Sequence, residues 1–137
     1  MTSVERRVAE FIRENFPNAE VYVAGRDRVA RIAGPTFIVW LRRSEATYTI
    51  GMVSSFLEHE FDVVYVRPVV GDVDAGFEEA ERDVDALISV LMRSAGAIGC
   101  LAVVYVAGYD LAESVRRPGY AVYRLRFRAL ELHAPTG

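Results

Sequence analysis

The chain has 137 residues, of which 52% are hydrophobic and 26% charged, which suits one domain that buries roughly 68% of its extended-chain surface. Its net charge of -3 gives no reason to expect tight nucleic-acid binding, no apolar run approaches the ~20 residues that cross a bilayer, and we expect no signal peptide. All sixteen basic residues are arginine and Cys100 is the single cysteine, which excludes a Schiff-base lysine, a Gly-Lys-Ser/Thr phosphate loop and an internal disulfide.

The first predicted element is a surface helix with one apolar stripe. Thr2 and Glu5 have the spacing of a capping box, and Pro17 ends the helix. The apolar positions recur at helical spacing: Val4, Val8, Phe11, Ile12 and Phe16. We therefore expect this helix to lie on a sheet.

Short extended segments follow, at Glu20–Ala24, Arg28–Ile32 and Thr36–Leu41. The apolar run Phe37–Leu41 is typical of a strand covered on both faces. The polar segment Arg42–Ser55 is predicted to be a long hairpin excursion, and such segments are candidates for contact with another molecule.

Two segments with strict alternation, Phe56–Pro68 and Tyr120–Leu132, predict neighbouring strands, each with one apolar face. The opposite face of the first carries an acidic ladder, defined as Glu58, Glu60 and Asp62. The opposite face of the second carries an arginine ladder, defined as Arg124, Arg126 and Arg128. Burial of the apolar faces is worth about 1.5–3 kcal/mol per large side chain, against roughly 0.2–1 kcal/mol per cross-strand ion pair, so the apolar faces set the register. The ladders could pair within one chain, pair across a subunit boundary, or both face solvent.

Between these two strands, the sequence predicts a turn at Val69–Gly76 and a second helix that Gly96 and Gly99 terminate. The apolar positions of that helix are Phe77, Ala80, Val84, Leu87, Ile88 and Leu91. An apolar strand at Cys100–Ala107 and a long loop at Gly108–Gly119 follow, and residues 133–137 are predicted to be a flexible tail. The expected fold class is α+β, a mostly antiparallel sheet with two helices on one face, in one domain over residues 1–137.

A search for catalytic chemistry finds no nucleophile motif. The sequence lacks a Gly-x-Ser-x-Gly elbow, and Cys100 lies in an apolar segment typical of a structural thiol. His59 falls on an apolar strand face and is interpreted as a hydrogen-bonded packing residue. The acidic ladder could bind Mg²⁺ in a small metal-dependent nuclease, but we expect arginine to neutralise it. We therefore expect no catalytic, cofactor or metal site, with a small-molecule-binding domain of the same fold class as a further alternative.

The order of elements resembles the tail terminator (minor tail) proteins of long-tailed bacteriophages. The segments that carry the resemblance are Glu58–Pro68, the Gly108-Tyr109-Asp110 turn and the alternating Tyr123–Phe127. The resemblance implies a structural virion protein and not an enzyme. It implies a six-membered ring that caps the tail tube, stops its polymerisation and meets the head-closure (stopper) proteins.

The implied partners are further copies of the chain, the tail tube protein and a head-completion protein, with DNA passing through the lumen without specific binding and no membrane. The implied location is the virion tail or neck, and the host cytoplasm during assembly. Another neck or tail-completion protein of the same fold is the alternative. The candidate contact residues for neighbouring subunits or the tube are Glu58, Glu60, Asp62, Tyr109, Asp110, Arg116, Arg117, Arg124, Arg126 and Arg128.

Overall fold

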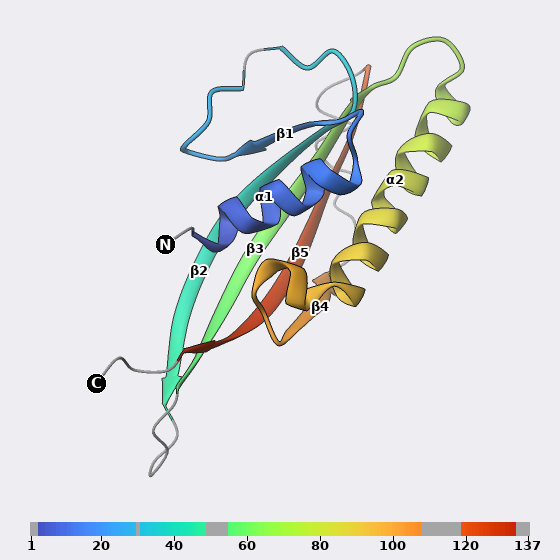
Figure 1. The fold of residues 1–137 in the computed structure, drawn as a ribbon. Coiled ribbons are helices and arrows are strands. Elements are labelled where there is room, and N and C mark those ends of the chain that lie inside the picture. The colour runs from blue at the N-terminus through green and yellow to red at the C-terminus, as the bar shows by residue number, and fades with distance from the viewer. Residues whose placement is uncertain (1–2, 30, 49–54, 108–118, 134–137) are drawn as a thin grey trace.

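The computed structural model describes residues 3–29, 31–48, 55–107 and 119–133 (Figure 1). Within these ranges, two α-helices, one short 3₁₀ helix and five strands follow one another in the order α1 (Val4–Asn15), β1 (Glu20–Val23), β2 (Thr36–Tyr48), β3 (Ser55–Pro68), α2 (Val73–Arg93), η1 (Ala95–Ile98), β4 (Ala102–Ala107) and β5 (Tyr120–His133). The predicted segments Gly108-Tyr109-Asp110 and Arg116-Arg117 lie outside the described residues, as does most of the predicted tail.

The strands form one five-stranded sheet in the order β1-β2-β3-β5-β4. Strand β1 pairs in parallel with β2, and the other three pairings are antiparallel. Both helices lie on the same face of this sheet (Figure 1), which we call the inner face. The predicted α+β class is therefore confirmed, and β3 and β5 are neighbours as expected.

The two helices form because one stripe of each is apolar and covers the sheet. In α1 the buried apolar positions are Val4, Val8, Ala9 and Ile12, and in α2 they are Ala80, Val84, Leu87 and Leu91. They meet the aromatic and aliphatic inner side chains of the strands, with Phe61 stacked on Phe127 at a centroid distance of 5.5 Å. Most of the predicted core thus lies between the helices and the two alternating strands.

The predicted helix starts need correction. The cap of α1 is Ser3, which makes no side-chain cap hydrogen bond, and Glu5 instead forms an ion pair with Arg26 at 3.0 Å, so the capping box is wrong. Helix α2 begins at Val73, not at Phe77, because the Asp72 carboxylate accepts from two backbone N–H groups of the first turn. Gly76 lies inside that helix, where a Cβ would stand 2.8 Å from Val69.

Three strand predictions are also corrected. Arg28–Ile32 contains no strand among its described residues, and Arg42–Tyr48 is not a loop but the second half of β2, paired to β3 as far as Tyr48↔Ser55. Strand β2 is covered on its inner face alone, since Phe37 is buried while Trp40 is 42% exposed. The long apolar run was therefore a poor guide to burial on both sides.

Candidate interaction surface

The sheet face opposite the helices carries most of the charged side chains of the central strands. Alternation places these side chains on one side of β2, β3 and β5, and we call this group the charged outer face. It consists of Trp40, Arg42, Arg43, Glu45, Glu58, Glu60, Asp62, Arg124, Arg126 and Arg128.

The acidic ladder pairs within one chain with Arg126 and Arg128 of the arginine ladder, while Arg124 lies opposite Val64. The backbone register places Glu60 opposite Arg128 and Asp62 opposite Arg126. Arg126 Nε lies 3.0 Å from the Asp62 carboxylate and 3.4 Å from Glu60, and Arg128 Nε lies 3.7 Å from Glu58. Of the three arrangements that the sequence left open, the structure has the intrachain one.

A β-bulge in β2 adds two further arginines to this network. The register shifts between Leu41 and Arg43, so that Arg42 is the extra residue. Arg42 then lies 3.5 Å from Asp62 and Arg43 lies 3.4 Å from Glu60. In a bulge, two residues of one strand lie opposite a single residue of its partner strand. Two consecutive arginines can therefore point to the same face of the sheet.

Asp62 is the centre of the network. It is fully buried, at 0% exposure, and is held between Arg126 and Arg42. The hydrogen bond from Arg126 Nε to Asp62 raises the pKa of the guanidinium, and the neighbouring negative charges act in the same direction. A buried carboxylate requires such partners, because an unpaired charge away from water is costly.

The outer face also has an aromatic platform that sequence reasoning missed. The Arg42 and Arg124 guanidiniums lie 5.0 and 5.8 Å from the centre of the Trp40 ring. This is the geometry of a cation–π contact. Trp40 was missed because the apolar run Phe37–Leu41 was interpreted as covered on both faces. Arg42 and Arg43 were missed because the bulge interrupts the alternation that would have marked them as outward-facing.

A second polar cluster lies on the inner face and joins five elements, α1, β2, β3, η1 and β5. The Ser44 hydroxyl is 2.7 Å from His59 Nδ1, and His59 Nε2 is 2.8 Å from the Glu131 carboxylate. Arg7, from α1, donates to Glu131 at 2.9 Å and to the Ile98 carbonyl at 2.8 Å. His59 is therefore buried and hydrogen-bonded, as predicted, in a chain that ties α1 to the sheet.

The carboxylates of the outer face are arranged for arginine and not for a cation. Each member of the acidic ladder has at least one guanidinium within 4 Å. Within the described part of the chain, no group of three or more His, Cys, Asp or Glu side chains is placed to hold a metal ion. Cys100 is buried, and its burial raises the pKa of the thiol, which disfavours a reactive thiolate.

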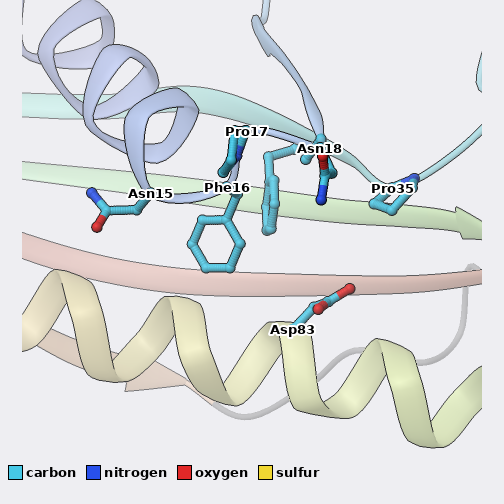
Figure 2. Close-up of a pocket in the computed structure, with 8 residues that line it drawn as sticks. Asn15, Phe16, Pro17, Asn18, Pro35 and Asp83 are labelled. Carbon is cyan, nitrogen blue, oxygen red and sulfur yellow. The ribbon is translucent and has the colours of Figure 1, made fainter.

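Two of the depressions on the described surface differ in their chemistry. One, of about 210 Å³, lies between the end of α1 and α2, and Phe16 and Asp83 are among the residues that line it (Figure 2). The Asp83 carboxylate in this depression already accepts hydrogen bonds from the Tyr65 hydroxyl and from Arg67. The other, of about 490 Å³, lies beside β4 on the outer face and is mostly apolar; it is lined by Glu58, Ala102, Val104, Val106, Arg128 and Leu130.

The structure thus brings together six of the ten predicted contact residues, those of the two ladders, and the other four lie outside the residues it describes. Five of the six are partly or fully exposed, whereas Asp62 is buried and cannot itself touch a partner. No described helix has the length and apolar character needed to span a membrane.

Comparison with known proteins gives a likeness of fold. No family model and no curated protein matches the sequence. A solved structure described as "Virion of native gene transfer agent (GTA) particle" contains a chain that matches with a TM-score of 0.55 and 15% identity, over 95% of this chain and 92% of that chain. Another solved chain matches with a TM-score of 0.45 and 17% identity over 93% of this chain, which is too low to support an argument.

Proposed function

We propose that the chain is a structural virion protein of a tailed, phage-like particle, and within that class a tail terminator. In this role a ring of copies, six in the family that the sequence resembles, caps the tail tube and meets the head-closure proteins. The observation that carries the proposal is the fold likeness to a chain of a gene transfer agent virion, which extends over nearly the full length of both chains.

The chemistry of the described surface supports an assembly role over catalysis. The Glu60 and Asp62 carboxylates, which could act as metal ligands or as general bases if they were free, are ion-paired with guanidiniums. The outer face instead offers exposed arginine and an exposed aromatic ring, which are residue types enriched at protein interfaces. The same arginine pairing argues against the metal-nuclease alternative, because a cation at Asp62 would have to displace two guanidiniums.

The proposal is tested by polymerising purified tail tube protein with and without the chain. We expect the chain to stop elongation, to lie at one end of each tube in negative-stain electron micrographs, and to assemble as a ring by mass measurement. A chain that stays monomeric with tube protein, and leaves tube lengths unchanged, would overturn the proposal.

A matched pair of variants tests the predicted loop contact. Arg116→Ala with Arg117→Ala removes two charges from a predicted contact loop, and we expect it to weaken tube capping at least tenfold. The control, Arg28→Ala with Arg31→Ala, removes two charges from exposed positions on the β1 side of the fold and should cap normally. Equal effects of the two pairs would count against the loop as a contact.

The same experiment separates the terminator from another neck protein of this fold. A terminator binds the end of the tube and stops its growth. A tail-completion or head-closure protein would bind its neck partner and leave the length of free tubes unaffected.

A further inference from the structure

Strand β4 forms an edge of the sheet, and the described residues give it none of the usual protection against further pairing. Among the residues that the structure describes, β4 pairs only with β5, and no strand pairs with its other edge. Its sequence, Ala-Val-Val-Tyr-Val-Ala, has no charge and no proline, and Val104 and Val106 are 52% and 42% exposed. An exposed apolar edge of this kind is a template on which another strand can pair.

A second open edge lies on the other side of the sheet, on β2. Strand β1 covers β2 only as far as the pair Val23↔Val39. From Trp40 onward, no described strand lies on that side of β2. This edge carries Arg42, Arg43 and Glu45, so its backbone groups are open but its side chains discourage indiscriminate pairing.

The two open edges lie at the same level of the sheet. Following the register across four strands, Val104 stands in one row with Arg128, Glu60 and Arg43. By the same register, the first residue of β4, Ala102, lies in one row with Glu45 of β2, and the last, Ala107, lies in one row with Trp40. The stretch of β2 left open by β1 is therefore the stretch that faces β4 across the sheet.

The strand directions allow the two edges to meet in copies of the same orientation. Three successive antiparallel pairings separate β2 from β4, so these two strands run in opposite directions. A neighbouring copy, turned about an axis but not inverted, presents its β2 antiparallel to β4. Each copy then uses one edge on each side, which is the heterologous contact that a closed ring requires.

We infer that the β2 edge Trp40–Glu45 of one copy pairs with the β4 edge Ala102–Ala107 of the next. This inference rests on the proposed ring and names the contact that builds it. The neighbour's outward-facing side chains at Trp40 and Arg43 then cover the exposed valines of β4 and the apolar depression beside them. A six-residue pairing is small by itself, but closure gives every copy two such contacts.

Cysteine cross-linking tests the pairing. Arg43→Cys and Val104→Cys stand in the same row, and directly opposed residues on paired strands have Cα atoms about 4.5–5.5 Å apart, within the range of a disulfide. On oxidation, the double variant should give a ladder of covalent multimers that ends at the ring. The wild type, whose single cysteine is buried, should give none.

Single variants separate this arrangement from a two-fold one. Val104→Cys alone should stay monomeric under denaturing conditions, because β4 meets β2 and not another β4. A strong covalent dimer of Val104→Cys alone would overturn the inference in favour of an isologous dimer. Arg43→Cys with Met92→Cys is the matched control, since Met92 is 46% exposed on α2, and it should give no ladder.

A second measurement does not depend on cysteine. Val104→Lys places a charge on the open edge and should shift the native mass from ring to monomer, while Met92→Lys should leave it unchanged. Thermal unfolding confirms that both variants fold. If rings persist in Val104→Lys, or if the double cysteine variant forms rings without a ladder, the edge pairing is wrong although the proposed function stands. If the chain neither forms rings nor caps tubes, the proposed function fails as well.

Discussion

Removing the guanidinium that holds Asp62 should destabilise the fold far more than removing its neighbour on the same strand. Arg126→Met keeps the length of the apolar stem and leaves the fully buried carboxylate with Arg42 alone, at 3.5 Å. Breaking a buried ion pair costs about 3–5 kcal/mol. Because Arg126 is itself one-third exposed and Arg42 remains, we expect about 2 kcal/mol.

The control is Arg128→Met. Its partner Glu58 is 3.7 Å away, and both side chains are more than 40% exposed. Exposed pairs of this kind contribute about 0–1 kcal/mol. The two variants remove the same charge from the same face of β5, so that the difference between them reports the burial of Asp62.

Urea denaturation followed by circular dichroism, at one fixed protein concentration, measures both. With a slope of about 1–3 kcal/mol per molar urea, Arg126→Met should lower the midpoint by about 1 M, and Arg128→Met by less than half of that. Adding Asp62→Asn to Arg126→Met should recover part of the loss, because the uncompensated charge is gone. Equal losses in the two arginine variants, or strict additivity with Asp62→Asn, would refute the reasoning.

Three further predictions concern the helices and their supports. Arg6 and the Val23 N–H hold the pKa of Asp27 below its usual value, so its stabilisation is present above the unfolded pKa and is lost as pH falls through the lower folded value. Asp27→Asn should therefore lower stability at pH 7, and this deficit should shrink as the pH falls through the folded pKa; a deficit that stays the same as the pH is lowered would contradict this. Tyr65→Phe removes the hydroxyl that donates to Asp83 and should cost about 1–2 kcal/mol in urea denaturation, whereas no loss would mean that water replaces it. Burial raises the pKa of the Cys100 thiol, so iodoacetamide at pH 8 should label the native chain at least tenfold more slowly than the urea-unfolded chain, and equal rates would contradict its burial.

The alternating strands were predictable because a period of two leaves a direct record in the sequence. Both the apolar inner face of β5 and the two rows of like charge follow from that period. The second half of β2 was missed because its bulge at Arg42 places two charged residues in succession on one face. The start of α2 was misplaced although Asp72 offered a recognisable cap.

The inner polar cluster could be predicted only in part. A histidine on an apolar face signals that it needs partners, but not which ones. Ser44 and Glu131 lie 15 and 72 residues from His59, and only the pairing of β3 with both β2 and β5 brings them to it. Likewise, the sequence identified both ladders but could not decide whether their partners came from the same chain.

The bulges of the two open edges flank a single aromatic row. The shift in β2 lies on one side of the row Leu41–Phe61–Phe127–Tyr105, and the shift in β4, between Tyr105 and Ala107, lies on its other side. Since each bulge increases the local twist of its strand, we expect the sheet to twist most strongly at this row. In the proposed ring, we expect the twist at this row to contribute to the angle between neighbouring subunits. Deleting the extra residue from one strand alone would put the residues of the β2 edge out of register with those of the β4 edge. We therefore expect related chains that lack one bulge to lack the other as well.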